Sequence, residues 1–352
     1  MNSSISVRNM LDRLRAEGLV PADSGSLRVL SVQPPTVPPW YVRVFAGMGA
    51  WVAALLVLAF LRIVGALRSE TTALILGIGA CGVAVAFSRV RERGDFLSQL
   101  ALSLSLLGQS LVTVGMFMLL QAAVPVALAV IVLELVLIGV YADQFHRFLS
   151  GLAIVGALLV ILADGQQFDL IHGLLLGLAV LAATVSVYEY ALLSTDWWEV
   201  VHPLRYAAVV ALLGLLVLPL QTGFAVIWWW FSALGLEAVL AGVIWLIARD
   251  LGVIWRRDWL LVGLAMGVGI AVLGIKMPGV VAALLVLVLG FWRSNRTLMG
   301  LAAAFLLFYL GAYYYSLQLT LLSKSLAMLG AGGMLLGLRW VAARLSHQGA
   351  EQ

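Results

Sequence analysis

Charge is scarce in this sequence, and that scarcity excludes most soluble folds. Charged residues make up 11% of its 352 residues and hydrophobic residues 63%, and the only two lysines are Lys276 and Lys324. A soluble domain is nearer about one half apolar and about one quarter charged. A soluble protein with a very large core would need polar helix faces, which are missing because apolar runs recur along almost the whole chain. The composition therefore predicts an all-α fold, a polytopic transmembrane helical bundle.

Cysteine and the common catalytic motifs are also scarce. The single cysteine, Cys81, lies inside an apolar run, which excludes an intramolecular disulfide and predicts a small buried side chain. The sequence contains no HExxH, no CxxC and no phosphate-binding loop, and its four histidines show no metal-ligand spacing. We therefore expect no catalytic residue, no cofactor and no metal. The residues leave an enzyme open but favour a non-enzymatic protein.

Residues 1–40 differ from the rest of the chain. They contain no apolar core of the signal-peptide type, so no cleaved secretion signal is expected. Residues 1–32 are predicted to be a cytoplasmic segment with a short basic amphipathic helix, because apolar residues and arginines alternate at helical spacing. This helix either lies on the membrane surface or a partner, or is a small solvated helix. Four prolines in residues 33–40 then predict a stiff, extended linker.

The remainder is predicted to be a transmembrane helical domain, residues 41–343, followed by a cytoplasmic tail, residues 344–352. A span needs about 17–25 apolar residues. The fifth, ninth and tenth runs are short, so they are expected to be tilted, partial or re-entrant. The last two runs are continuous and need a turn between Gln318 and Ser323, because a single helix would be about twice as long as the hydrocarbon core is thick. The twelve predicted spans are 42–66, 71–88, 97–120, 124–141, 148–163, 170–192, 204–220, 224–248, 259–274, 279–292, 297–317 and 321–341.

The distribution of basic residues predicts the orientation. With the N-terminus in the cytoplasm and twelve alternating spans, only four of the 21 basic residues fall on the outer half, namely Arg62, Arg68, Lys276 and Lys324. Cytoplasmic loops carry an excess of Lys and Arg, so an N-in/C-in topology is expected. The same bias explains the net charge of +4 by arginines at helix ends, and no nucleic-acid partner is expected.

Ionisable residues inside spans are the first functional candidates, because charge is costly in lipid. Glu134 and Glu237 each lie near the middle of a predicted span. Each forms either a proton or cation site in a polar cavity, or a structural carboxyl that holds helices together. Lys324 lies in the outer third of the last span and either extends to the outer interface or pairs with a glutamate. Glu189 lies near an inner end, where it can reach water.

A polar stripe on the third predicted span is the second candidate. Gln99, Ser103, Ser110 and Thr113 fall within about 80° of arc at 100° per residue. The stripe either lines a hydrophilic path or joins helices by hydrogen bonds, and the second role is the more common one.

Three weaker patterns complete the candidates. The tripeptide GQS at residues 108–110 has the shape of an intramembrane serine-protease motif, with His172 as a conceivable base. Asp164, Asp169 and His172 form a small polar group that either binds a cation or is a solvated turn. Residues 173–177, GLLLG, form one of three GxxxG matches that fit close helix packing.

Three stretches of this sequence resemble a known family. They are PWYVRVFAGMGAWVAALLVLAFL at residues 39–61, RGDFLSQLALSLSLLGQ at 93–109 and YYYSLQLTLLSKSL at 313–326, which is followed by a Gly-rich helix. Each resembles the bacterial inner-membrane family called domain of unknown function 4401, and the likeness runs from about residue 38 to 343. The resemblance implies no particular activity. It implies a membrane partner, because members of this family tend to be encoded beside a membrane-anchored protein with a GDYxxLxY motif.

These observations favour three functions in order. The first is a multi-pass protein of the bacterial inner membrane, in contact with lipids, that acts as a non-enzymatic subunit with membrane-protein partners. The second is a secondary transporter or lipid-handling permease that uses Glu134 and Glu237. The third is a membrane enzyme with a cleft near Ser110, His172 or Asp164.

Overall fold

The computed structural model describes residues 40–65, 68–90, 95–218, 229–250, 277–316 and 329, and all regular structure in these residues is helical. The predicted N-terminal segment, the linker up to residue 39, the spans 259–274 and 321–341, Lys324 and the C-terminal tail lie outside the described residues. The helices are α3 (Trp40–Ile63), α4 (Glu70–Ser88), α5 (Asp95–Leu120), α6 (Ala123–Val140), α7 (Gln144–Asp164), α8 (Ile171–Val187), α9 (Glu189–Leu193), α10 (Trp198–Leu215), α11 (Trp229–Asp250), α13 (Pro278–Trp292) and α14 (Arg296–Ser316). A 3₁₀ turn at Phe168–Leu170 precedes α8.

The membrane character expected from composition agrees with these helices. Within the described residues, eight helices are long and apolar enough to cross a bilayer, and α13 is a shorter apolar helix of 15 residues. The all-helical fold is confirmed. The count of twelve spans and the N-in/C-in orientation stay predictions.

Two helix boundaries differ from the sequence prediction for a physical reason. Helix α7 begins at Gln144 rather than 148, because the Asp143 carboxylate caps it by accepting a hydrogen bond from the His146 N–H at 2.8 Å. Helix α10 begins at Trp198 rather than 204 and contains Pro203. Polar residues therefore enter both helices where hydropathy alone predicts a loop.

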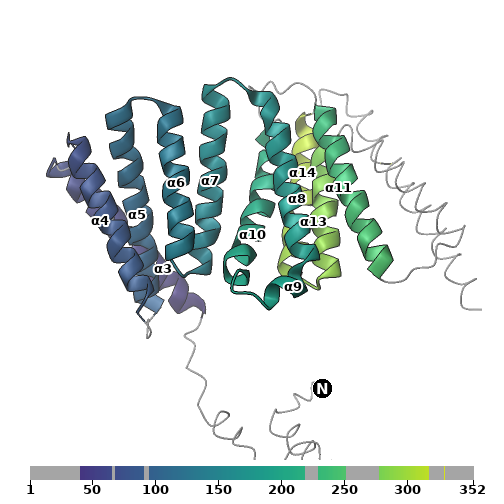
Figure 1. Cartoon of the computed structure of the whole chain (residues 1–352), viewed down its shortest axis with the longest axis horizontal. Coiled ribbons are helices and arrows are strands. Elements are labelled where there is room, and N and C mark those ends of the chain that lie inside the picture. Colours follow the sequence, from purple (N-terminus) through teal and green to yellow (C-terminus); the bar gives the residue numbers. More distant parts are fainter. Residues whose placement is uncertain are drawn as a thin grey trace, which may run out of the picture.

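The helices stand side by side in an elongated row (Figure 1). Helices α3, α4, α5, α6 and α7 form one half of the row, and α8, α10, α11, α13 and α14 form the other. Neighbours in the row are α4 and α5, α5 and α6, α6 and α7, then α7 and α10, which join the two halves. The larger apolar core lies in the second half, where α8, α10, α11, α13 and α14 pack together.

Small residues allow the closest approach between α4 and α5. A Cβ atom built on Gly108 would lie 2.6 Å from the Cys81 Sγ and 2.8 Å from the Cys81 N, and one on Gly77 would lie 2.8 Å from the Gly108 carbonyl oxygen. The two backbones therefore touch, as small residues permit in membrane helices. By contrast, Gly173 and Gly177 of the GxxxG match have open space at their Cβ positions.

Candidate functional site

A buried polar cluster lies where α5, α6 and α7 meet. Helix α5 contributes Ser105 and Gln109, α6 contributes Glu134, and α7 contributes His146 and Ser150. The exposed fractions of Ser105 and His146 are 0%, and those of Glu134 and Ser150 are 1%. Polar groups removed from water in this way need hydrogen-bond partners.

His146 is the hub of this cluster. Its Nε2 lies 2.8 Å from the Ser105 Oγ and 3.1 Å from the Gln109 Nε2, and its Nδ1 lies 3.3 Å from the Ser150 Oγ. The Ser150 hydroxyl also hydrogen bonds to the Glu134 carboxyl. Three helices are thus joined through one imidazole ring.

The count of available protons assigns the direction of each bond. A serine hydroxyl has one proton, and when Glu134 is ionised Ser150 donates it to the carboxylate. In that state His146 donates its Nδ1–H to Ser150, and its unprotonated Nε2 accepts from Ser105 or from the Gln109 amide. The arrangement holds a neutral histidine in one tautomer, assigned from the hydrogen-bond network.

Glu134 is the open end of the network. Its Oε2 is inaccessible to solvent and has no hydrogen-bond partner among the described residues. From α4, Cys81 interacts electrostatically with Glu134, and its Sγ lies 3.8 Å from the Ser105 carbonyl oxygen. An oxygen without a hydrogen-bond partner inside packed helices costs free energy, so stability alone does not explain this carboxyl.

The α6–α7 hairpin places these groups at one depth. Glu134 lies seven residues before Tyr141 and Ser150 lies seven residues after Asp143, so in antiparallel helices the two side chains stand at the same height. At 1.5 Å per residue, that height is about 10 Å from the turn. The Tyr141 ring stacks on the His146 ring with centroids 4.0 Å apart and closes the cluster towards the turn.

Next to the cluster, Arg147 joins α6, α7 and α10. Its Nε donates to the Ile138 carbonyl at 3.0 Å, and its Nη1 donates to the Glu199 carbonyl at 2.9 Å. Ile138 is among the last four residues of α6, whose carbonyls lack helical partners. Glu199 lies four residues before Pro203, which has no N–H to bond it. One buried guanidinium therefore satisfies two backbone acceptors that the helices themselves leave open.

A second buried ionic cluster closes the end of α8. Glu189 accepts from the Arg205 Nη1 at 3.0 Å and lies 3.8 Å from the Arg293 Nε. Arg293 also donates to the Ser186 and Val187 carbonyls, each at 2.6 Å, which are among the last carbonyls of α8. The Arg205 side chain is 1% exposed. Glu189 is the counter-ion of these two arginines and keeps 19% of its side chain exposed.

The predicted polar stripe on α5 is divided by the fold. Ser110 and Thr113 donate to the Leu106 and Gln109 carbonyls of their own helix, each at 2.8 Å. Ser103 is buried with no partner for its hydroxyl among the described residues, and Gln99 is half-buried. The side chains of α5 that bridge helices are Ser105 and Gln109, which the stripe did not include.

The other sequence candidates lie apart from this cluster. Glu237 is half-buried on α11, and its Oε1 is inaccessible with no partner among the described residues. The His172 Nδ1 lies 2.6 Å from the Ser232 Oγ, whereas Asp164 and Asp169 are exposed. No group of three or more His, Cys, Asp or Glu side chains that could hold a metal occurs in the part of the chain that the structure describes.

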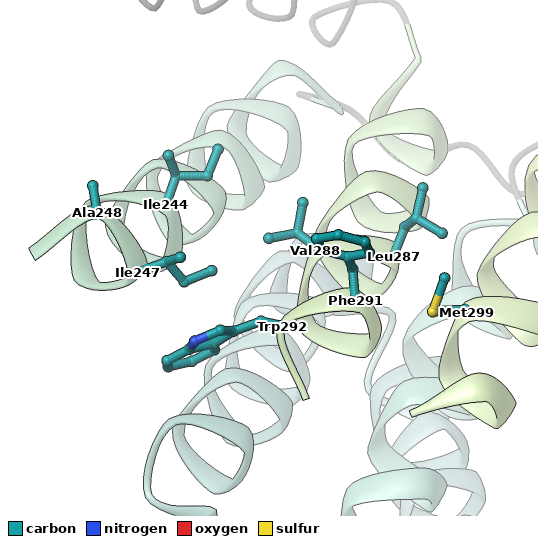
Figure 2. A pocket seen from close by; sticks show the side chains of 8 residues that line it. All are labelled: Ile244, Ile247, Ala248, Leu287, Val288, Phe291, Trp292 and Met299. Atoms are coloured by element: carbon teal, nitrogen blue, oxygen red, sulfur yellow. The ribbon is translucent and has the colours of Figure 1, made fainter. Parts of the chain in front are cut away.

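Two grooves lie outside the polar cluster. The larger has a volume of about 650 Å³ and is apolar, with Ile244, Ile247 and Ala248 of α11 opposite the α13 side chains (Figure 2). Its remaining lining residues are Leu287, Val288, Phe291, Trp292 and Met299. The smaller, of about 550 Å³, lies among α7, α10 and α14 and includes Gln144, His202 and Tyr206. Neither groove is lined by Glu134 or Glu237.

The spacing of the missed residues is a usable signal. Ser105 and Gln109 are four residues apart on α5, and His146 and Ser150 are four residues apart on α7. Each pair lies on one face of its helix. Sequence alone shows the two faces but not that they meet, since it does not say which helices are neighbours.

The long apolar helices, the buried carboxyl and the paired arginines define a polytopic helical membrane protein. Within that class, the chain belongs to the family called domain of unknown function 4401, whose model matches residues 39–345. The resemblance stated from the three sequence stretches is thereby confirmed. Comparisons with curated proteins and with solved structures gave no match.

Proposed function

We propose that the chain is a non-enzymatic subunit of a complex in the bacterial inner membrane, where it binds lipids and at least one membrane-protein partner. By family resemblance, that partner is the neighbour-encoded protein with the GDYxxLxY motif. The proposal rests on one observation, the environment of Glu237 on α11.

Glu237 lies near the middle of α11, at the edge of a face that no described helix covers. One face of α11, with Ser232, Leu236 and Leu240, is buried. The other face exposes large apolar side chains, namely Trp230, Phe231, Leu234, Ile244 and Trp245. A carboxyl oxygen without a partner is costly in lipid, and a hydrogen-bond donor on a neighbouring membrane helix removes that cost. The α11 face thus suits a transmembrane helix that carries a donor.

Co-purification tests this proposal. The full chain is isolated from native membranes in mild detergent, and a second membrane protein is expected in stoichiometric amount. Glu237→Gln is expected to weaken its recovery, whereas Ser110→Ala, at an exposed hydroxyl on the opposite half, leaves it unchanged. Recovery of a lone stable chain from native membranes would refute the subunit function.

Photo-crosslinking then identifies what contacts α11. A photoreactive residue at Ala238 or Ala241, both exposed on α11, is expected to link to the partner. The same residue at Val136 of α6, which is 56% exposed, is the matched control and is expected to link to no protein. A link only to residues 251–276 of the same chain would mean that this chain covers its own α11, and it would contradict the docking surface.

A proton-coupled permease is the second candidate function. It is favoured because Glu134 and Glu237 both keep an enclosed oxygen without a partner among the described residues. Reconstituted vesicles are expected to show proton flux when a gradient of the transported solute is applied, and Glu134→Gln is expected to abolish it. Flux equal in wild type and Glu134→Gln would exclude a permease that uses this carboxyl.

We also propose twelve spans with both termini in the cytoplasm, because this arrangement leaves only four basic residues on the outer half. Labelling with a membrane-impermeant thiol reagent checks it in a Cys81→Ala background. Gln167→Cys, in the exposed link between α7 and α8, is expected to react from outside intact cells. Ser194→Cys, in the exposed link before α10, is expected to react only after the membrane is opened. Equal reaction of both in intact cells would reject the topology.

A further inference from the structure

We infer that His146, Ser150 and Glu134 form a proton-transfer relay that passes a proton between the imidazole ring and a protonatable carboxyl inside the helix row. This inference goes beyond the subunit function and does not depend on a partner.

The relay is continuous in the structure. The Ser105 Oγ contacts the His146 Nε2 at 2.8 Å, the His146 Nδ1 contacts the Ser150 Oγ at 3.3 Å, and the Ser150 hydroxyl bonds to the Glu134 carboxyl. Every member except the unpaired Oε2 of Glu134 is already bonded to the next. Imidazole can accept a proton on one nitrogen while it releases one from the other, which makes histidine suited to this role.

The transfer is balanced at each atom. A proton that enters at the Nε2 of His146 makes the ring an imidazolium. The Nδ1–H then passes to the Ser150 Oγ, and the Ser150 hydroxyl releases its own proton to the Glu134 carboxylate. The products are a neutral carboxylic acid and a neutral imidazole that carries its proton on Nε2. Rotation of the hydroxyl and return of the ring proton to Nδ1 reset the relay.

The entrance lies on the Nε2 side of His146. Ser105 is fully buried there, but Gln109, which also contacts Nε2 at 3.1 Å, is only half-buried. Gln109 is therefore the most exposed member of the network. The proton enters at Nε2 and leaves from Nδ1 towards Glu134, so the two ring nitrogens give the path a direction.

The charged and titratable neighbours are compatible with this path. Helix α4 contributes Cys81 beside Glu134, and α5 contributes only the neutral Ser105 and Gln109. Around His146, the α6–α7 hairpin contributes the stacked ring of Tyr141. It also contributes a negative charge at Asp143 and a positive charge at Arg147. Arg147 is itself held by the Ile138 and Glu199 carbonyls, so its guanidinium is not the partner of Glu134.

A purely structural polar cluster predicts a different arrangement. Side chains that only hold helices together are stable when all their polar atoms are paired, because a half-satisfied network is worse than an apolar core. Here His146, Ser150 and Ser105 are paired, and the unpaired atom, Oε2, belongs to the Glu134 carboxyl that accepts the proton. The unpaired atom therefore lies at the end of the relay and not inside it.

Infrared difference spectroscopy on the full chain in lipid bilayers tests the relay. On steps between about pH 5 and about pH 8, wild type is expected to show a carboxylic-acid carbonyl band that is lost in Glu134→Gln and kept in the control Glu237→Gln. After transfer to heavy water, Ser150→Ala is expected to slow deuteration of that band about 100-fold, and Ser150→Thr, which keeps the hydroxyl, to restore the rate.

Either of two results would overturn the inference. The first is the absence of any pH-dependent band that is lost with Glu134. The second is equal deuteration rates in wild type and Ser150→Ala, with thermal unfolding showing that the variant is folded. Because these measurements use the isolated chain, failure of the relay leaves the co-purification result unaffected, and loss of the partner leaves the band unaffected.

Discussion

Removal of the Arg147 guanidinium tests whether Pro203 is the reason for its position. In Arg147→Met the apolar stem is approximately kept, but the Ile138 and Glu199 carbonyls both lose their donor. A buried acceptor left without a partner costs about 1–3 kcal/mol. With two such acceptors, we expect the free energy of unfolding to fall by about 2–6 kcal/mol.

The sharper measurement is a double-mutant cycle with Pro203→Ala. Alanine restores an N–H at residue 203, which can bond to the Glu199 carbonyl four residues earlier. In that background Arg147→Met leaves only the Ile138 carbonyl unpaired, so its cost is expected to shrink by about 1–3 kcal/mol. The ion pair with the Glu199 carboxylate, at 4.0 Å and with that side chain 75% exposed, contributes little.

The assay is reversible unfolding of the four proteins in mixed micelles with increasing denaturing detergent, followed by circular dichroism. Arg249→Met is the control, because Arg249 is exposed and its guanidinium carbon lies over the Trp245 ring, 5.5 Å from the ring centroid. It is expected to cost less than about 1 kcal/mol. Equal costs of Arg147→Met with and without Pro203 would refute the explanation.

Two further predictions concern the helix contacts. Gly108→Ala is expected to push α4 away from α5, because its Cβ would lie 2.6 Å from the Cys81 Sγ. We expect it to lower the free energy of unfolding by about 1–3 kcal/mol in the same assay. Gly173→Ala, which has open space at its Cβ position, is the control, and equal effects of the two variants would contradict the close contact. Glu189→Gln removes the counter-ion of the buried Arg205 and is expected to cost about 3–5 kcal/mol, whereas an unchanged midpoint would show that the ion pair is dispensable.

The two functional proposals use different halves of the molecule. The relay lies among α5, α6 and α7, whereas the docking face with Glu237 lies on α11 at the other end of the row (Figure 1). The packing of α7 against α10 joins the halves, and Arg147 bonds to both α6 and α10 at that junction. Partner binding and proton transfer can therefore be measured separately by variants of Glu237 and Glu134.

The helices were predictable because apolar runs of sufficient length must be helical in lipid. The predicted starts of α7 and α10 were too late, because His146, Arg147 and Pro203 lie in helices. Hydropathy assigns such residues to loops. The His146 and Arg147 side chains are instead paired with α5, α6 and α10. A hydropathy average over one segment of the sequence cannot detect such contacts between helices.

Glu134 was identifiable from its depth in an apolar run, because a carboxyl there is costly wherever it points. Its network was not identifiable. Ser105 and Ser150 are common residues in membrane helices, and His146 stood out only as a histidine without metal-ligand spacing. Arg205 and Arg293 were assigned to the inner half by the count of basic residues, and the sequence did not show that both lie beside Glu189.

By itself the sequence determined the class of this protein, its helices and its deepest carboxyls, because these depend on local hydropathy and on the cost of charge in lipid. The tertiary structure decided which polar residues act together. Hydrogen bonds form over about 3 Å, whereas Ser105 and His146 are 41 positions apart and Glu189 and Arg293 are 104 apart. Only the order of the helices in the row brings such distant positions within that reach.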